Sequence, residues 1–426
     1  MTLMKRKIIT LLACLAVATA AMAQEIEYTG VRIFDPSVHS VQVAPASNPY
    51  LPPVIMMGGD DRINVSFDIL DYDVHYLRYS VYHCDAMWRP SQLVESEWVS
   101  GFNQADINDY AQSQATFTHY YNYALSLPND EMQLLISGNY LVRVYEQDDP
   151  DKVLFQTRFS LCENRVGVQA GVTSRTDFDY NDAHQQLDIT LNFKPGTIMD
   201  PYGELTTVVT QNTRTDNEVV LRQPMSVGVG TVTYDHQPQL IFKAGNEYRR
   251  FETVFEHSLN MGVQAIEYFE PYYHATLYRD EPRIGREYVY DQTQHGRFTI
   301  RNAEADDNAT EADYMVTHFT LDTGGERWTG GNIFLEGEFA HGLPAQQVLM
   351  QWDQTMMCYS CDLLLKQGAY NYQYLWVPDG TQVGRTDFID GDKYQTVNNY
   401  YIRVYDRPSG ERYDRLVGFG VTRSGI

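Results

Sequence analysis

The sequence predicts an all-β protein built from several β-sandwich domains in tandem. Three observations lead to this prediction. Apolar and polar residues alternate in short runs, which is the period of a strand with one buried face. Turn-forming residues interrupt these runs about every ten positions, as in β-sandwiches. No long segment repeats its apolar residues at the helical period of 3.6.

The clearest strand runs in the N-terminal third lie on either side of residue 70. Ile63, Val65 and Phe67 fall on one face of the first run, and Tyr79 and Val81 fall on one face of the next. Neighbouring residues in a strand point to opposite sides, so each set would line a core.

Further runs follow along the whole chain. One covers residues 141–145, after a turn at 137–139. Another covers residues 187–193 and ends at Lys194-Pro195-Gly196, which a strand cannot continue through. Ile402 and Val404 alternate near the C-terminus. The chain therefore reads as β from end to end, with short connections.

The N-terminus has the pattern of a secretory signal peptide. Lys5-Arg6-Lys7 is basic, residues 8–20 are apolar and small, and Ala21-Met22-Ala23 forms a cleavage site before Gln24. We therefore predict residues 1–23 as a signal peptide cut between Ala23 and Gln24.

A lipoprotein cysteine at Cys14 is the alternative reading of this N-terminus. Only six apolar residues precede it from Ile8, which is short for the apolar part of a signal. No later segment reaches the ~18 uncharged apolar residues of a membrane-spanning helix.

Length and charge limit the classes of protein that fit. A chain of 426 residues exceeds one hydrophobic core, so several domains are expected. The net charge of −24 disfavours binding to nucleic acid and to anionic lipid surfaces. We predict domains at 24–165, 166–301 and 313–426, with the acidic, small-residue segment 302–312 as a linker.

The stretch His83-Cys84-Asp85-Ala86-Met87-Trp88 gathers several residue types that carry chemistry. Adjacent strand residues face opposite sides, so His83 and Cys84 cannot form a nucleophile pair. No second group with metal-ligand spacing lies nearby. We interpret His83, Trp88 and Phe102 as a structural motif that holds the first sandwich together, with His83 bonded to a backbone group.

The cysteines allow one disulfide and little else. Cys84 and Cys162 would both lie on strands of the first domain, and an oxidising compartment permits a bridge between them. Cys358 and Cys361 form a lone C-x-x-C in a strand-like setting, without the helix N-terminus that redox chemistry needs. We predict no metal and no cofactor.

The C-terminal third resembles early-set immunoglobulin-like modules of the glycogen-binding type. The resemblance lies in residues 330–339 and 363–380, a glycine-led strand followed by a strand–turn–strand with Tyr-x-Tyr and Asp-Gly. In sugar-binding members a tryptophan follows the phenylalanine, but Ala340 follows Phe339 here. Trp352 or Trp376 would have to substitute, so carbohydrate binding is kept as the alternative function.

A longer resemblance covers nearly the whole chain after residue 23. Its motifs are His83-Cys84-x-Ala86-x-Trp88-x-Pro90-Ser91, Glu97-Trp98, Gly101-Phe102-Asn103, Leu127-Pro128-Asn129, residues 137–145 and Lys366-Gln367-Gly368-x-Tyr370-Asn371-Tyr372. These motifs resemble the type IX secretion system plug proteins, once catalogued as a domain of unknown function. Asp85 and Met87 depart from the pattern, in which Asn and Asp would be expected.

The resemblance implies a protein that is not an enzyme. Plug proteins sit in the periplasm against the inner mouth of a giant outer-membrane β-barrel, the type IX translocon, and occlude it while no substrate passes. The resemblance thus implies a monomeric subunit of a secretion complex, with that barrel as its partner. A secreted hydrolase with an unrecognised acidic pair is a further alternative, because an acidic chain always contains such pairs.

One aromatic segment has the composition of a partner interface. Residues 266–283 are rich in tyrosine, and Tyr and Trp are favoured at interface centres. We predict Tyr268, Phe269, Tyr272 and Tyr273 as interface aromatics, with the alternative that half of them are core.

Overall fold

The protein is nearly all β, as the sequence predicts. The structure, a computed structural model, describes residues 29–258 and 260–425. The predicted signal peptide and its cleavage site, Ala23 and Gln24, lie outside these residues. None of the helices in the described part has the length and hydropathy of a membrane span.

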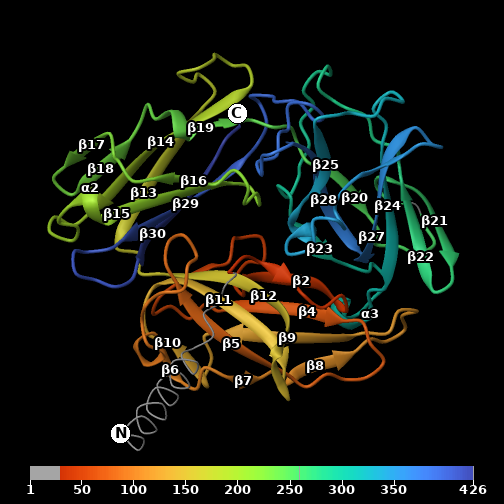
Figure 1. Ribbon diagram of the computed structural model, residues 1–426, viewed down its shortest axis with the longest axis horizontal. Helices are drawn as coiled ribbons and strands as arrows, with labels where there is room; N and C mark the ends of the chain where they lie inside the picture. The colour runs from red at the N-terminus through yellow and green to blue at the C-terminus, as the bar shows by residue number, and fades with distance from the viewer. Residues whose placement is uncertain (1–28, 259, 426) are drawn as a thin grey trace, which may run out of the picture.

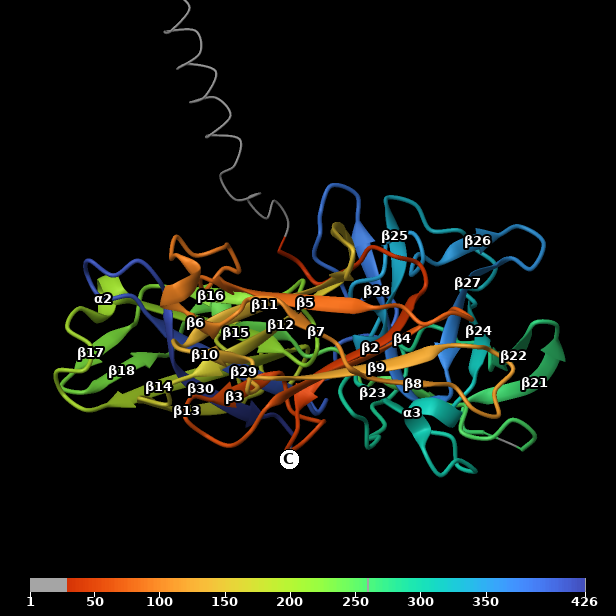
Figure 2. The same cartoon turned by 90° about the horizontal axis from the view of Figure 1, so that it is seen from below.

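The strands form three sandwich-like lobes, each with its own apolar core (Figure 1). In Figure 1 the first lobe lies below, the second at upper left and the third at upper right. In Figure 2, where the molecule is seen from below, strands of the first lobe lie across both of the other lobes.

The first lobe pairs a six-stranded sheet, β1-β12-β11-β5-β7 with β3 on β12, with the four-stranded sheet β2-β4-β9-β8. A two-stranded sheet, β10-β6, lies beside them. The elements are β1 (Arg32–Ile33), β2 (Val38–Pro45), β3 (Val54–Met56), β4 (Ile63–Ile69), β5 (Leu77–Cys84), η1 (Glu95–Glu97), β6 (Val99–Gly101), β7 (Ala105–Asp106), β8 (Asp109–Gln112), β9 (Tyr121–Leu127), β10 (Met132–Leu134), β11 (Gly138–Glu146) and β12 (Asp149–Cys162).

The second lobe combines the five-stranded sheet β13-β14-β18-β17, with β19 on β14, and the four-stranded sheet β16-β15-β29-β30. Two of its strands come from the C-terminus of the chain. The elements are β13 (Val166–Thr173), β14 (His184–Phe193), α2 (Pro201–Glu204), β15 (Leu205–Gln211), β16 (Val219–Leu221), β17 (Ser226–Gly228), β18 (Thr231–Tyr234), η2 (Pro238–Leu240), β19 (Ile241–Lys243), β29 (Asn399–Asp406) and β30 (Arg415–Arg423).

The third lobe is inserted between these two parts of the second. It combines the four-stranded sheet β20-β28-β23, with β25 on β28, and the five-stranded sheet β21-β22-β24-β27-β26. The elements are β20 (Arg249–Glu252), β21 (Val263–Phe269), β22 (Tyr272–Leu277), β23 (Phe298–Ile300), α3 (Asn308–Glu311), β24 (Tyr314–Leu321), β25 (Gly331–Glu336), η3 (Glu338–Ala340), β26 (Gln351–Asp353), β27 (Cys358–Lys366) and β28 (Gly368–Pro378).

The alternating runs form the cores because their apolar side chains share a face. Ile63, Val65 and Phe67 on β4 are fully buried in the core of the first lobe. Ile402 and Val404 on β29 are fully buried in the second. Complete burial of such a side chain contributes about 1.5–3 kcal/mol, which fixes the register of each strand.

The strand pairing corrects the predicted division at residues 301–313. Val209 on β15 pairs with Ile402 on β29, so segments 166–301 and 313–426 share a sheet. Phe251 on β20 likewise pairs with Tyr370 on β28. Local composition cannot show this, because pairing is decided by strands that are far apart in the sequence.

The predicted linker 302–312 is a packed segment of the third lobe. Asp307 caps α3 by accepting a hydrogen bond from the Ala309 N–H at 3.0 Å. Thr310 and Ala312 are buried, and the Tyr120 hydroxyl of the first lobe donates to the Ala312 carbonyl at 2.8 Å. The acidic side chains of segment 302–312 are mostly exposed, while its backbone contacts the first lobe.

Candidate docking face and the junctions behind it

The free end of the second lobe exposes several large apolar side chains. Tyr202 lies on α2 and Met199 just before it, while Met225 precedes β17, Val227 lies on β17 and Val229 lies in the turn after it. We call these five residues the end face. Apolar residues gathered on one surface mark an interaction site more often than single ones do.

The β17–β18 hairpin places Val229 at its tip. Gly228 pairs with Thr231, which leaves a two-residue loop of Val229 and Gly230. Gly230 has a φ of +71°, and a Cβ there would lie 2.5 Å from the Phe193 carbonyl oxygen, so the turn requires glycine. Nothing in the turn requires valine, yet Val229 is 88% exposed. Such loops usually carry Gly, Asn or Asp, so an exposed valine is unusual at this position.

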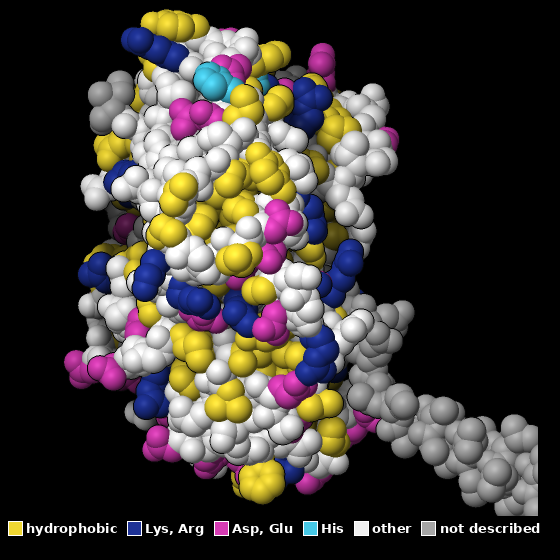
Figure 3. All heavy atoms as spheres, turned by 90° about the vertical axis from the view of Figure 1, so that its left-hand side faces the viewer, with side chains coloured by type: hydrophobic (Ala, Val, Ile, Leu, Met, Phe, Trp, Pro, Cys, Tyr) yellow, Lys and Arg dark blue, Asp and Glu magenta, His cyan; other side chains and the backbone are white. Residues whose placement is uncertain are grey.

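Figure 3 shows this end of the molecule with its side chains coloured by type. Apolar side chains lie above and below a belt of basic and acidic side chains that crosses this end of the molecule. Ion pairs where the second lobe meets the first include Arg407–Asp414 at 2.6 Å and Arg165–Glu163 at 3.1 Å. Exposed pairs of this kind contribute about 0–1 kcal/mol each, so the belt sets charge pattern more than stability.

The histidine–tryptophan motif lies where the first lobe meets the second. His83 is buried at the end of β5, and its Nε2 lies 3.1 Å from the Ser137 carbonyl oxygen. Its ring also packs edge-on against Tyr413 of the β29–β30 loop. Burial lowers the pKa of His83 to about 4, so the ring is neutral near pH 7.

The Trp88 ring contacts two arginines from different lobes. It is 8% exposed and has a φ of +62°. The guanidinium carbon of Arg158 lies 4.5 Å from the ring centroid and that of Arg403 on β29 lies 5.9 Å away. Cation–π contacts of this kind favour a fixed ring, so the motif helps to join the lobes as well as to build the first one.

Phe102 does not belong to this motif. The sequence predicts it as a buried partner of Trp88, but its side chain is 85% exposed. It follows Gly101, whose positive φ of +99° turns the chain outward where β6 ends. Trp98 is the buried aromatic of this stretch instead, at 5% exposed.

The predicted disulfide is absent from the structure. Cys84 and Cys162 are both free and fully buried. Cys84 packs with Trp88 and Leu141, whereas Cys162 packs with Ala86 and residues of the second lobe. Burial raises the pKa of Cys84 to about 12 and that of Cys162 to about 11, which makes both thiols unreactive.

A buried ion pair joins the first and third lobes. The Lys366 ammonium on β27 lies 2.6 Å from Oδ2 of Asp68 on β4, and both side chains are almost completely buried. The Tyr314 hydroxyl donates to the same oxygen at 2.6 Å, and the ammonium lies 4.1 Å from the ring centroid of Tyr120. Burial lowers the pKa of Lys366, while the charge of Asp68 opposes that shift.

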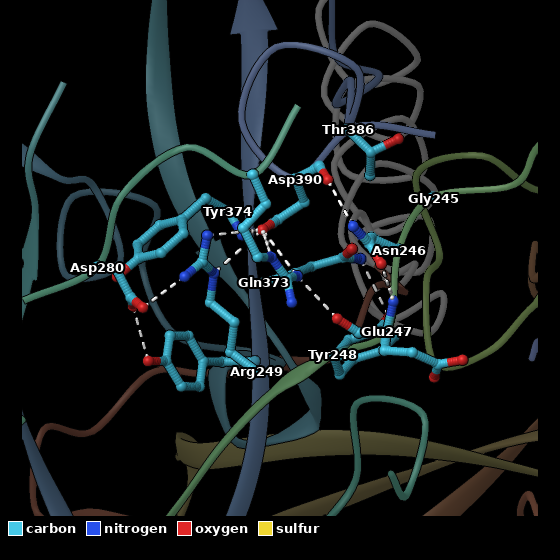
Figure 4. A network of polar contacts seen from close by, with 12 residues as sticks. Gly245, Asn246, Glu247, Tyr248, Arg249, Asp280, Gln373, Tyr374, Thr386 and Asp390 are labelled. Carbon is cyan, nitrogen blue, oxygen red and sulfur yellow. Dashed lines mark hydrogen bonds and ion pairs between the residues drawn. The ribbon is translucent and has the colours of Figure 1, made fainter. Parts of the chain in front are cut away.

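A second polar network lies between β20 and the chain segments that lead back to the second lobe (Figure 4). Arg249 bonds Asp390 at 2.9 Å and also pairs with Asp280, whose other oxygen accepts from the Tyr374 hydroxyl at 2.8 Å. Asn246 donates to the Asp390 carbonyl at 2.8 Å. Burial alone would raise the pKa of Asp390, but the charges of Arg249 and Arg283 outweigh it and hold that pKa low.

The predicted interface aromatics divide between surface and core. On the β21–β22 hairpin, Tyr268 and Phe269 are exposed and Tyr272 is half-buried, while Tyr273 is buried in the third lobe. Phe117 of the first lobe contacts Tyr268 with tilted rings and Tyr273 edge-on, at 5.0 and 5.4 Å between ring centroids. Part of this cluster therefore serves a contact within the chain.

The side chains that sugar binding would need are packed in the third lobe. Trp376 is 6% exposed in its core, and Trp352 packs against the same core. No group of three or more metal-ligating side chains occurs in residues 29–258 and 260–425.

The end face is not among the sites predicted from the sequence. The available signal was the stretch Met225-Ser226-Val227-Gly228-Val229-Gly230, where apolar residues alternate with the glycines of a turn. A turn that keeps its apolar residues is unusual because turns are normally exposed.

Comparison with known proteins places the chain in a family. Residues 38–163, which correspond to most of the first lobe, match the model described as Type 9 secretion system plug protein 1st domain. A crystal structure of a hypothetical protein from Parabacteroides merdae is 40% identical over 93% of this chain and 99% of its own, with a TM-score of 0.91. An alkylpurine DNA glycosylase from Pseudomonas fluorescens bound to DNA covers 31% of this chain and 30% of its own at 14% identity, and its TM-score of 0.18 carries no argument.

No curated protein matches the chain. The matched family is one of secretion-system plug domains rather than of enzymes, and it assigns the chain a role in type IX secretion. The match falls on the lobe that contains the histidine–tryptophan motif. The chain belongs to the type IX secretion system plug protein family.

Proposed function

We propose that this protein is a periplasmic plug without catalytic activity. It binds the periplasmic mouth of the giant outer-membrane barrel of the type IX translocon and occludes it when no substrate is being exported. The observation that carries the proposal is the match of the first lobe to plug domains, in a chain whose first and third lobes are joined by a buried ion pair.

Occlusion needs a body that does not deform when it is pressed against a wide opening. The junction between the first and third lobes suits this task, because separating these lobes would break the buried ion pair of Lys366 with Asp68. Three lobes that move as one body present a single fixed surface to the barrel.

The end face is the surface that we assign to the barrel contact. It combines aliphatic, methionine and tyrosine side chains with a nearby belt of charges, as in an interface with an apolar centre and a polar rim. A stable contact buries about 1,200–2,000 Å² in total. Neighbouring surfaces of the first lobe would therefore have to take part as well.

The test measures entry of a bulky antibiotic or dye into cells from which the gene for this protein has been deleted. The same cells are then supplied with the wild-type protein or with a variant. The double variant Met225→Glu/Val229→Glu should fold normally, because both side chains are exposed, and should leave the outer membrane leaky. The matched control Val289→Glu changes a 75% exposed valine on the third lobe and should restore the barrier.

Two results would refute the proposal. One is an intact barrier in cells without the chain while the exporter stands idle. The other is failure of the wild-type protein to co-purify with a very large outer-membrane barrel. If the barrier depends on the chain but not on the end face, only the assignment of the surface is wrong.

A further inference from the structure

A cleft of about 550 Å³ lies between the first and third lobes, away from the end face. Six consecutive residues of β27, 360–365, line one wall, and three consecutive residues of β2, 39–41, line another. In a strand, consecutive side chains point to opposite faces. A wall made of consecutive residues is therefore the edge of a strand, and we call this site the strand-edge cleft.

The edge of β27 is open because its neighbour leaves the sheet. β26 pairs with residues 358–360 of β27. The chain just before β26 pairs with the other sheet, where the Met350 N–H donates to the Ile333 carbonyl and the Leu335 N–H to the Val348 carbonyl, both at 2.9 Å. Among the described residues, 361–365 therefore pair with β24 alone.

The edge of β2 is open as well. β2 ends its sheet and pairs only with β4 in the part of the chain described. Its register shifts between His39 and Gln42, where Ser40 has a φ of +52°. This bulge lies at the cleft, and bulges turn a strand edge away from its regular course.

All but one of the side chains around the cleft are apolar or uncharged near neutral pH. Asp362 is the one lining residue that carries a formal charge at neutral pH, because burial lowers the pKa of His39 and brings that of His341 to about 4. Proteins usually protect open strand edges with lysine, proline or covering loops. Two open edges that share one sparsely charged cleft are suited to hold another strand.

We propose that the strand-edge cleft binds an extended, non-acidic peptide segment of another chain by strand addition. Backbone N–H and C=O groups of residues 361–365 pair with the segment, as in other cases of β-augmentation. Five strand residues span about 17 Å. Asp362 and the negative charge of the whole chain disfavour acidic segments and favour a basic side chain nearby. This activity is additional to occlusion and does not depend on it.

The experiment uses the full chain and an acetylated, amidated hexapeptide of sequence Thr-Val-Lys-Val-Thr-Val. Titration calorimetry should show one site per chain. Hydrogen–deuterium exchange should slow in residues 361–365 and 39–43 together. A peptide that is N-methylated at alternate residues keeps its side chains but loses backbone donors, so it should bind about tenfold more weakly or worse.

A matched pair of variants locates the site. Gln347→Trp fills the cleft from its exposed rim and should abolish binding, whereas Gln382→Trp changes an exposed glutamine outside the cleft and should not. The wild-type exchange pattern decides the question even if the first variant folds poorly.

Several outcomes would overturn the proposal. They are equal binding of the N-methylated peptide, protection confined to other strands, closure of the cleft by a second copy of this chain in solution, and binding of maltoheptaose in place of the peptide. A chain that binds the hexapeptide yet fails to seal the outer membrane would refute occlusion and leave this inference standing.

Discussion

Single side chains in this protein act mainly where lobes meet. The Trp88 ring contacts Arg158 of the first lobe and Arg403 of the second, and His83 contacts Tyr413 across the same boundary. Phe102 is next to a glycine turn and is exposed. The role of each residue is thus set by the lobe packed against it and not by its own chemical type.

Replacing Trp88 by alanine should destabilise the protein by about 3–5 kcal/mol, the usual cost of truncating a buried tryptophan. Phe102→Ala is the matched control and should leave the free energy of unfolding nearly unchanged, since that ring contacts mostly solvent. Denaturant titration measures both. Equal effects of the two changes would contradict the structure.

Acid should destabilise the fold partly through His83. Its pKa is about 4 in the folded chain, below the ordinary value of 6.5, so the folded state binds fewer protons than the unfolded state. The stability it contributes is present above pH 6.5 and is lost as the pH falls through 4, by about 3 kcal/mol at 1.36 kcal/mol per unit. His83→Gln should flatten the fall of the denaturation midpoint between pH 6.5 and 4. An unchanged slope would show that His83 does not titrate this way.

At the scale of elements, contacts between strands that are far apart in the sequence determine how the lobes dock on one another. β4 and β27 do not pair, yet Asp68 and Lys366 meet across the junction and share Tyr314. A buried charge is tolerated only with its partner, so this contact selects one docking of the third lobe on the first.

Lys366→Met should cost about 3–5 kcal/mol, because it leaves the Asp68 carboxylate buried without its cation. Asp68→Leu/Lys366→Met removes both charges and should recover part of that loss. A double-mutant cycle by denaturant titration measures the coupling energy. Additive effects would mean that the pair does not hold the lobes together.

For the whole molecule, the insertion of the third lobe into the second makes the fold depend on its C-terminus. β29 sits between β15 and β30 in its sheet, and the third lobe separates it in sequence from β15. The second lobe, which carries the end face, therefore forms only after the third has been made.

Ending the chain after residue 396 removes β29 and β30 and should unfold the second lobe, since β15 then loses its long partner. Limited proteolysis should cut within residues 164–246 of the shortened protein. A control chain that ends after Ser424 keeps both strands and should resist. Resistance of the 396-residue chain would show that the second lobe does not need its C-terminal strands.

Local pattern was enough to predict much of the fold. The alternation at Ile63, Val65 and Phe67, or at Ile402 and Val404, shows which face of a strand is buried, since burial and strand period act within a few residues. The motifs around Trp88 were enough to indicate the family. The candidate site was not predictable in the same way, because the end face is defined by what remains uncovered after three lobes have packed.

The sequence by itself determined the all-β character, the strand faces and the plug-family resemblance, because these depend on periodicity and local motifs. Only the tertiary structure decided that β15 pairs with β29, that Lys366 finds Asp68, and that Phe102 faces solvent. The physical reason is that a strand's pattern shows that one of its faces must be buried, while the partner that buries it is chosen by contacts between segments nearly 200 residues apart, such as Val209 and Ile402.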